Sequence, residues 1–433
     1  MSGKSPGPDR PADELRRRIA QQGPVGFDEF MAVALYHPRG GYYASAESRT
    51  GRQGDFFTSV SVGPVFGKLL AAQFLEMRAL LGDPADFTLV EQGANDGQLM
   101  HDILSVWPGT PPRVIIVEPL EQRRAAQLGK LSPWREQVTH AAHEDELPSF
   151  TGVFFANELL DAFPVKLLVR EDGQWLERRV DAEGERFVFR EVPLRDPETL
   201  AAAQSLPVEG GGRFCTEWCP PLASWMRTLA EKIRRGWLFL VDYGHPAAAR
   251  FHPARADGTL ASYRGHQRST DPLAAPGAQD LTSHVDFTAV ARAAEGAGLR
   301  LAGFTDQHHA LTALAAKVFP SMPEQSLSAE AAREMRALRQ LIHPESMGTS
   351  FKFLALARTP TATFPPSVSP VIPGASSSHD PADTRTTRSR PTSRSDPPRR
   401  HVSALGEPPL SPLAPRTRSH PTDPAARAPR RHL

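Results

Sequence analysis

The sequence predicts an α/β fold, in which a mostly parallel sheet carries helices on both faces. The first observation is that short apolar runs typical of buried strands alternate along the chain with longer segments of helical period. The second is that one such run, residues 87–91, leads through a glycine-flanked turn into a helix. The third is that an acid, Glu118, follows the next strand. At 433 residues the chain can bury a substantial core in one large or two ordinary domains.

The rest of the chain can be placed around residues 87–104. A strand that runs through a small-residue turn, here 93–97, into a helix opens a ligand-binding crevice in an open α/β sheet. Small or φ-permissive residues let the backbone of such a turn approach a ligand closely. About 20 residues further on, the strand at 114–117 ends in Glu118, which could accept both hydroxyls of an adenosine ribose.

The turn restricts the ligand that this crevice could hold. The sequence has no G-x-x-x-x-G-K-S/T phosphate loop, which counts against a nucleoside triphosphatase. The turn also lacks a full G-x-G-x-x-G pattern, which counts against a dinucleotide. S-adenosylmethionine (SAM) has no phosphate and suits a shorter turn. The alternative is that this strand-turn-helix unit binds no ligand at its turn.

The elements before and after this unit are predicted from periodicity and turn residues. We expect the first 12 or so residues to be disordered, and the turn-rich segments 40–43 and 51–59 to be loops that could cover a ligand. Helices are expected at 14–22, 27–35, 63–81, 220–235, 288–297 and about 308–342. Further strands are expected near 138 and at 152–156, 237–241, 301–304 and 351–357.

Two regions depart from the plain alternation of strands and helices. Residues 165–170 and 174–180 form a predicted hairpin, and 187–192 adds a strand to a β-rich insertion of roughly 165–215. Residues 246–280 are predicted to be loop-like. Within them, Tyr263, Arg264 and His266 are expected to be exposed to whatever lies above the sheet.

Polar side chains follow two of the predicted core strands. Asn157, Glu158 and Asp161 come after the strand at 152–156, and Asp242 and His245 come after the strand at 237–241. Because the carboxyl ends of parallel strands meet at one edge of a sheet, these residues are candidates for a site beside the crevice. The alternative is that the first group caps the element that follows it.

Charge is unevenly distributed along the chain. From Pro360 onward there are 11 Arg, no Lys and 5 acids, which is +6, so the first 359 residues carry −5 of the total +1. A mildly acidic body argues against a nucleic-acid enzyme held by phosphate contacts. Residues 360–433 hold 16 of the 42 prolines and one aromatic residue, Phe364, and are predicted to be a disordered, solvated tail.

The remaining composition points to a cytoplasmic protein of bacterial type. Cys215 and Cys219 form a C-x3-C pair without a second pair of ligands, so we expect reduced thiols and no metal site. No apolar run approaches the roughly 20 residues of a membrane span. The N-terminus mixes acids with bases and has no apolar core, unlike a secretory signal or a transit peptide.

Taken in order, segments covering roughly residues 25–358 resemble the MidA-like family of SAM-dependent methyltransferases. This family includes the mitochondrial respiratory complex I assembly factor that methylates arginine. The matching segments are Gly41-Tyr42-Tyr43, Gly54-Asp55-Phe56, Thr58-Ser59, Val65-Phe66-Gly67, Glu91 with Gly93 and Gly97, Asp102-Ile103-Leu104, Val117-Glu118, Ala156-Asn157-Glu158, Asp161-Ala162, Pro164-Val165, Trp175, Asp242-Tyr243-Gly244-His245, Pro276-Gly277, Asp280-Leu281-Thr282, Val285-Asp286-Phe287, Gln307-His308 and Met347-Gly348 before Phe351.

The resemblance implies a class I methyltransferase (Rossmann-like) fold: a sheet of about seven strands, the last one antiparallel, with helical and β insertions. Residues 1–85 would cover the cofactor site, 86–359 would form the methyltransferase domain, and 360–433 would be the tail. The cofactor would be SAM, and the residues that bind it would be Gly41, Tyr42, Asp55, Thr58, Ser59, Glu91, Gly93, Asn95, Gly97 and Glu118. Glu158, Asn157 and Asp161 would face the methyl acceptor, with Asp242 and His245 as further catalytic candidates.

The implied activity is methyl transfer to a protein side chain, most plausibly arginine, of a partner such as a respiratory-complex subunit. A small-molecule methyltransferase and a non-catalytic assembly factor are the alternatives. In this family the turn after the first strand usually reads Gly-Pro-Gly-x-Gly, but Ala94 and Asn95 replace its second and third residues here. Asn is the best non-glycine residue for a positive φ, so the turn is expected to keep its shape. Val60-Ser61 likewise replaces the usual Pro-Glu. The sequence does not predict an oligomeric state.

Overall fold

The computed structural model describes residues 10–44, 58–265, 267–319 and 328–358. The chain divides into two compact units, 1–376 and 377–433, and every described residue belongs to the first. The predicted tail, the N-terminal residues 1–9 and the segment 45–57, which contains Asp55, lie outside the described residues. Among the described residues, no helix is long and apolar enough to cross a lipid bilayer.

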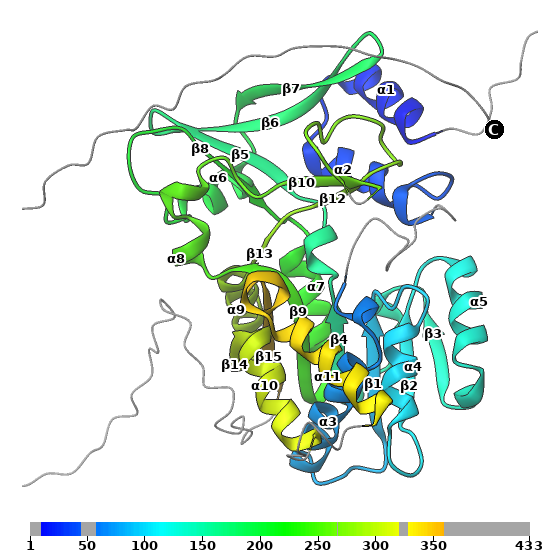
Figure 1. Cartoon of the computed structure of the whole chain (residues 1–433). Coiled ribbons are helices and arrows are strands. Elements are labelled where there is room, and N and C mark those ends of the chain that lie inside the picture. Colours follow the sequence, from blue (N-terminus) through cyan, green and yellow to red (C-terminus); the bar gives the residue numbers. More distant parts are fainter. Residues whose placement is uncertain (1–9, 45–57, 266, 320–327, 359–433) are drawn as a thin grey trace, which may run out of the picture. The chain divides into compact units, whose positions relative to one another are not determined.

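A mostly parallel sheet of eight strands organises the part of the chain that the structure describes (Figure 1). Seven strands follow one another across it in the order β3 (Val138–Ala141), β2 (Arg113–Val117), β1 (Phe87–Gln92), β4 (Phe150–Asn157), β9 (Ile233–His245), β15 (Phe351–Arg358) and β14 (Arg300–Asp306). The short β13 (Val285–Asp286) pairs with the end of β9. The first five strands of this order, β3, β2, β1, β4 and β9, are parallel to one another. β15 is antiparallel to both of its neighbours, β9 and β14. The predicted class I methyltransferase fold is confirmed.

The central strands are apolar on both sides because helices cover both faces of the sheet. Alternate residues of β1 therefore join different cores: Leu89 packs in one cluster and Val90 in the other. One face carries α3 (Val65–Leu80), α4 (Gln98–Ser105), α10 (Gln307–Val318) and α11 (Ala329–Ile342), and the other carries α7 (Leu222–Lys232) and α9 (Phe287–Gly296). Between β2 and β3 the chain forms α5 (Glu121–Lys130).

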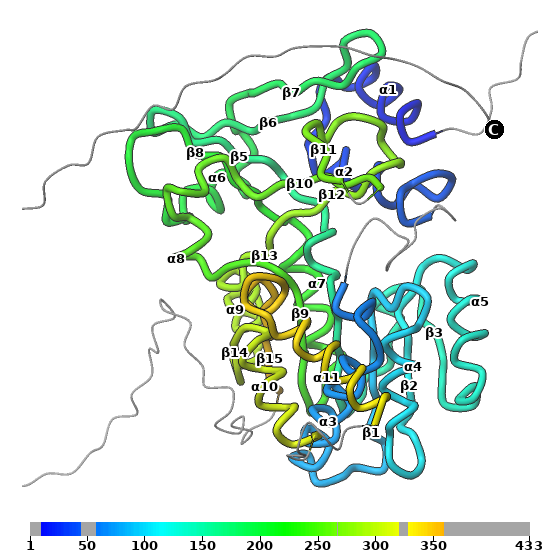
Figure 2. Tube along the Cα trace, viewed as in Figure 1, coloured from blue at the N-terminus to red at the C-terminus, as the bar shows by residue number. Residues whose placement is uncertain are grey.

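Two smaller sheets and the first two helices form a separate core. The four-stranded sheet has the order β7 (Arg186–Pro193), β6 (Gln174–Glu183), β5 (Lys166–Glu171) and β8 (Phe214–Trp218), and α6 (Pro197–Gln204) precedes β8. The three-stranded sheet has the order β11 (Gln267–Ser269), β10 (Ala261–Arg264) and β12 (Asp280–Thr282). Figures 1 and 2 show α1 (Pro11–Gln22) and α2 (Phe27–Tyr36) beside these strands, and Phe27, Phe30 and Phe187 meet in their shared core.

Several predicted boundaries were wrong. The helix expected at 220–235 ends at Lys232, because β9 begins at Ile233, whose backbone is paired with Phe150 of β4. The segment 246–280 is not simply a loop, because it contains α8 (Ala247–Arg250), β10 and β11. Of its three residues predicted to be exposed, Arg264 is exposed and Tyr263 is half-buried. His266 lies outside the described residues.

Two helix predictions also needed adjustment. The first helix begins at Pro11 rather than at residue 14, with proline in the first turn, where its missing N–H costs nothing. In the helical stretch expected at about 308–342, the described residues form α10 and α11, and residues 320–327 between them lie outside the described residues.

The pairing of β4 with β9 depends on two glycines that face each other, Gly152 and Gly236. A Cβ atom on Gly236 would overlap the carbonyl oxygen of Gly152. Gly236 also has a φ of 140°, which residues other than glycine rarely adopt. We expect Gly236→Ala to lower the free energy of unfolding by about 3 kcal/mol or more, measured by urea denaturation. Gly296→Ala, where nothing lies within 4 Å, is the matched control and should change stability by less than about 1 kcal/mol. Equal stability of the two variants would contradict the close approach of the strands.

Candidate functional site

The turn after β1 keeps the left-handed backbone that the sequence predicted. Gly93, Asn95 and Gly97 have φ values of 83°, 49° and 84°. Asn95 thus adopts the positive φ that asparagine tolerates best among non-glycine residues. A Cβ atom on Gly93 would lie 3.2 Å from Cδ1 of Leu159, so the Leu159 side chain would have to shift by a few tenths of an ångström, and the positive φ would strain any other residue here. The substitutions at Ala94 and Asn95 therefore leave the shape of the turn intact.

Glu118 lies at the end of β2, and a side chain that the sequence did not reveal joins it to this turn. Glu118 is buried, and its Oε1 accepts the N–H of Leu120 at 3.0 Å. Gln127 on α5 donates its amide to Asn95 O at 2.8 Å and to Glu118 Oε2 at 3.4 Å. Its Oε1 lies 2.9 Å from His140 Nε2. Gln127 therefore holds the turn, the acid and β3 in one arrangement.

Glu91, near the end of β1, is an acid for which the described residues provide no ion pair. Its side chain is buried, and among the described residues Oε2 has no hydrogen-bond partner. Burial, and then the nearby negative charge of Asp96, raises the pKa of Glu91 to about 8. An unpaired buried carboxyl group is costly, and a cationic ligand would offset that cost. The ammonium group of SAM has the required charge, so the residues around the turn fit this cofactor.

Asn157 and Glu158 extend from β4 at the same edge of the sheet. Glu158 has a φ of 53°, and its Oε1 accepts the side-chain amide of Asn157 at 3.0 Å. The backbone N–H of Ser59 also donates to the Glu158 carboxylate. Burial, and then the negative charge of Asp161, raises the pKa of Glu158 to about 8. Ser59, predicted from the cofactor side, thus contacts the acid predicted to face the acceptor.

Asp161 and Asp242 lie together but make different contacts. Asp161 accepts the hydroxyl of Tyr243 on Oδ2, whereas Oδ1 has no partner among the described residues. Burial raises the pKa of Asp161 to about 6. Asp242 Oδ2 instead accepts the backbone N–H groups of Leu159, Leu160 and Asp161 at 3.2, 2.9 and 3.3 Å. The contacts of Asp242 are those of a residue that positions the loop after β4.

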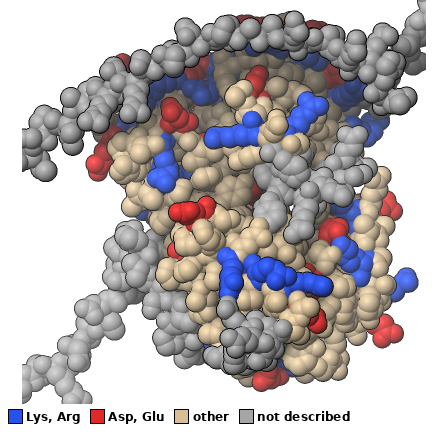
Figure 3. Space-filling view, viewed as in Figure 1, with Lys and Arg blue, Asp and Glu red and all other residues tan. Residues whose placement is uncertain are grey.

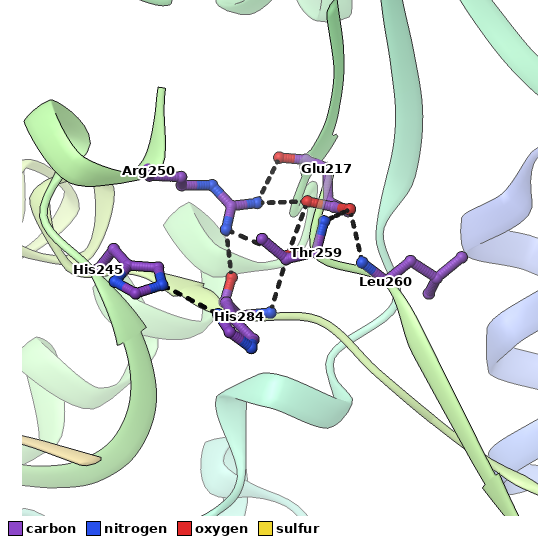
Figure 4. A network of polar contacts seen from close by, with 6 residues as sticks. All are labelled: Glu217, His245, Arg250, Thr259, Leu260 and His284. Atoms are coloured by element: carbon purple, nitrogen blue, oxygen red, sulfur yellow. Dashed lines mark hydrogen bonds and ion pairs between the residues drawn. The ribbon is translucent and has the colours of Figure 1, made fainter. Parts of the chain in front are cut away.

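His245 belongs to a different polar network (Figure 4). Its Nε2 lies 3.1 Å from His284 Nδ1, and burial and nearby cations lower the pKa of both imidazoles to about 4. The centre of this network is the buried ion pair of Arg250 and Glu217, at 2.7 Å, and Arg250 also donates to His284 O at 2.6 Å (Figure 4). Within the described part of the chain, no hydrogen bond joins His245 to Glu158.

The N-terminal residues reach the site through tyrosines. A Cβ atom on Gly41 would lie 2.8 Å from His37 O, which explains the glycine, and Tyr42 is buried. The hydroxyl of Tyr43 donates to the carboxylate of Asp280 at 3.1 and 3.2 Å. Tyr36 donates to Ala162 O at 2.8 Å. The contacts of Tyr36, Tyr43 and Asp280 could not be predicted from the sequence, because each joins residues more than 100 positions apart.

The last predicted residue of this group, Thr58, lies in the short loop before α3. It exchanges hydrogen bonds with Ser61: its N–H donates to Ser61 Oγ at 3.0 Å, and Ser61 N–H donates to Thr58 Oγ1 at 3.2 Å. Ser61 is one of the two residues that replace the family's usual Pro-Glu. The hydroxyl of Ser61 thus fixes the loop that presents Ser59 to Glu158.

Other ligands would be indicated by a strongly charged surface or by a group of side chains that could bind a metal ion. On the face drawn in Figure 3, basic and acidic side chains are interspersed and most of the surface is uncharged. Among the described residues there is no group of three or more His, Cys, Asp or Glu side chains that could hold a metal ion.

The fold and the site together define a class of enzyme. A sheet with a reversed last strand, a left-handed turn after the first strand and acids after the first, second and fourth strands are the features of a class I SAM-dependent methyltransferase. Residues 69–305 match the family model described as "Putative S-adenosyl-L-methionine-dependent methyltransferase". The chain belongs to this family, and its cofactor is SAM.

Relatives and solved structures agree with this assignment. A crystal structure from Burkholderia thailandensis, bound to S-adenosyl-homocysteine, is 30% identical and superposes with a TM-score of 0.73, over 82% of this chain and 95% of that one. The Drosophila melanogaster protein arginine methyltransferase NDUFAF7 homolog is 28% identical, over 80% of this chain and 84% of that protein. The Homo sapiens protein arginine methyltransferase NDUFAF7 is 27% identical, over 79% and 82%.

The raised pKa of Glu91 makes stability depend on pH. The folded protein holds this proton up to about pH 8, whereas the unfolded chain releases it near 4.5. Between these values the folded state binds more protons, so the stability of the ligand-free protein should fall as pH rises. Glu91→Gln has no proton to lose, and we expect its advantage over the native protein to grow to about 1–2 kcal/mol at pH 8. Thermal unfolding of both proteins between pH 5 and 8 measures this, and parallel curves would contradict it.

Proposed function

We propose that this protein transfers the methyl group of SAM to an arginine side chain of a partner protein. The observation that carries the proposal is the pair of acids Glu158 and Asp161 beside the cofactor turn. Leu159, which lies between them in the sequence, packs so closely on Gly93 that a Cβ atom there would lie 3.2 Å away. A cationic acceptor held by these acids would therefore lie next to the methionine end of the cofactor. The names of the Drosophila and human relatives support arginine as the acceptor.

In this proposal two acids and the turn bind the cofactor. Glu91 pairs with its ammonium group, Glu118 accepts the ribose hydroxyls, and the backbone of residues 93–97 approaches the methionine portion. When bound, SAM supplies an electrophilic methyl group on a sulfonium. The segment before α3 covers the site, which the Ser59 contact to Glu158 supports. In this proposal residues 1–85 form the cover, residues 86–359 the methyltransferase domain and residues 360–433 the tail.

Glu158 orients the acceptor and receives its proton. A carboxylate binds a guanidinium through two parallel hydrogen bonds, which fixes the plane of the cation. Asn157 holds one carboxylate oxygen of Glu158, and Asp161 adds negative charge beside it. The nitrogen that gains a methyl group must release a proton, and a carboxylate whose pKa is about 8 can take it. Positioning and charge account for most of the rate enhancement that these residues supply.

The partner and the compartment are part of the same proposal. We propose a respiratory-complex subunit as the acceptor protein and a cytoplasmic location of bacterial type. The resemblance of the chain to the assembly-factor family supports the first, and the free thiols of Cys215 and Cys219 support a reducing compartment for the second.

Removal of the ribose acid should abolish tight cofactor binding. Calorimetric titration of the full-length protein with SAM and S-adenosylhomocysteine is expected to show micromolar binding. We expect Glu118→Ala to weaken it about 30-fold or more, because two hydrogen bonds to a charged group are lost. Glu121→Ala, an exposed acid at the start of α5, is the control and should bind normally. A folded native protein that binds neither ligand would overturn the assigned cofactor residues.

Loss of the Glu158 charge should stop transfer and leave cofactor binding intact. We expect Glu158→Gln to lower methyl transfer about 100-fold or more, with S-adenosylhomocysteine affinity within about threefold. Transfer of labelled methyl from SAM to proteins extracted from cells that lack this gene, followed by hydrolysis to methylarginine, provides the measurement. Glu345→Gln, at an exposed site, is the control. Because Glu158 ionises only above a raised pKa, the native rate should rise with pH up to about 8. Label found only on residues other than arginine would refute the proposed acceptor.

A further inference from the structure

Two tyrosines from the N-terminal part of the chain form a stack beside the acids of the site. The rings of Tyr36 and Tyr43 lie 5.5 Å apart with an angle of 28° between their planes. The guanidinium of Arg123, on α5, lies 5.6 Å from the centre of the Tyr43 ring and donates to Tyr43 O at 2.8 Å. A cation thus already packs on Tyr43, one of the two rings of this stack.

Tyr36 is held at its hydroxyl and along its ring but is left partly open. Its hydroxyl is bound to Ala162 O, and Tyr43 covers one face of its ring. The residue is nevertheless 43% exposed, which is unusual among the large apolar residues that the structure describes. Tyr43 stacks on one face of the ring, which leaves the other face as the surface that a ligand could contact. A rigid aromatic surface of this kind can bind a partner with little loss of conformational entropy.

Negative charges surround this stack. The hydroxyl of Tyr43 is bound to the carboxylate of Asp280, and Tyr36 is bound to the residue after Asp161. The charges of Asp280 and Asp161 both act on the Tyr36 hydroxyl, which places the two acids near it. Asp161 also keeps one oxygen without a partner among the described residues. Carboxylates beside the face of an aromatic ring favour a planar, delocalised cation.

We propose that Tyr36 binds the side chain of the methyl acceptor, with its open face stacked on a guanidinium that Asp161 and Glu158 hold by hydrogen bonds. This inference rests on the proposed function and adds a specificity residue to it. A flat cation matches the ring, whereas the compact ammonium of lysine gains less from stacking. Each ring of the pair then has a cation beside it: Arg123 on Tyr43 and the acceptor on Tyr36.

The competing explanation is that Tyr36 only ties the end of α2 to the loop after β4. Substitutions separate the two roles. Tyr36→Phe removes the hydrogen bond to Ala162 O and keeps the ring. If Tyr36 only anchors α2, this variant loses its role; if Tyr36 stacks on the acceptor, this variant keeps it. Tyr36→Leu removes both the hydrogen bond and the ring, and Tyr36→Trp keeps a larger aromatic face, which binds cations best.

The test uses the full-length protein saturated with S-adenosylhomocysteine. It is titrated calorimetrically with n-propylguanidinium, which mimics the arginine side chain, and with neutral n-propylurea. We expect the native protein to bind the cation at least tenfold more tightly than the urea. Tyr36→Phe and Tyr36→Trp should stay within threefold of the native affinity, and Tyr36→Leu should lose about tenfold. S-adenosylhomocysteine affinity should change by less than threefold in all three variants, which also shows that they are folded.

The outcomes distinguish this inference from the proposed function. Native affinity of Tyr36→Leu for n-propylguanidinium would overturn the stacking role, as would a native protein that does not bind the cation. If Tyr36→Leu also transfers methyl groups to arginine with an unchanged acceptor KM, the proposed function stands without this residue. Binding of n-propylguanidinium that depends on Tyr36, combined with labelled methyl found only on other residues, would instead refute arginine methylation and keep the cation site.

Discussion

The carboxylate of Asp242 joins the ends of β9 and β4, and the geometry of the site depends on it. One oxygen accepts three successive backbone N–H groups, those of residues 159–161, and the other accepts the N–H of Tyr243. These bonds set the direction in which Glu158 and Asp161 leave the sheet. Burial, and then the charges of Asp161 and Glu158, raises the pKa of Asp242 well above its ordinary value. The protein therefore keeps three acids close together at an electrostatic cost, which the four backbone N–H groups on Asp242 partly offset.

The unpaired acids give the ligand-free site a preference for positive charge. Glu91 and Asp161 each have a buried oxygen without a partner among the described residues. A cofactor with an ammonium and a sulfonium group, together with a cationic acceptor, would supply the missing charge. Backbone strain occurs at the same place, because Asn95 and Glu158 are two of the five described non-glycine residues with positive φ. Such residues persist where the surrounding contacts enforce them, and the Asp242 bonds and the packing of Leu159 on Gly93 do so here.

Much of the sheet could be predicted from the sequence, because each core strand is a short apolar run that is buried on both faces. The turn after β1 could be predicted as well, since its shape depends on local backbone preferences. The end of α7 could not, because Ile233 becomes a strand only through its pairing with Phe150. The short strands β10 and β12 likewise depend on each other rather than on local propensity.

The residues that complete the site were harder to find for the same reason. Tyr36 contacts Ala162, which is 126 positions away, and Tyr43 contacts Asp280, which is 237 positions away. In the sequence Gln127 is simply one polar residue of a helix. Its partners, Asn95 after β1 and His140 on β3, come close to it only in the folded protein. Asp242 was correctly recognised as an acid at the right edge of the sheet. Only the structure shows that its oxygens face backbone amides.

The added segments matter because they change the medium in which these acids act. At the bare edge of a parallel sheet, water would surround Glu158 and Asp161, and their attraction for a cation would be weak. The Ser59 amide, the Tyr36 and Tyr43 rings and the strand that carries Asp280 replace part of this water with fixed dipoles and apolar surface. The Ser59 amide favours the charged form of Glu158 and lowers its pKa, whereas burial raises it. A charge–charge attraction strengthens as the local dielectric constant falls, so the burial that raises the pKa of Glu158 also makes its charged form a stronger ligand for a guanidinium. The high pKa of the empty site and its affinity for a cation thus have one physical cause.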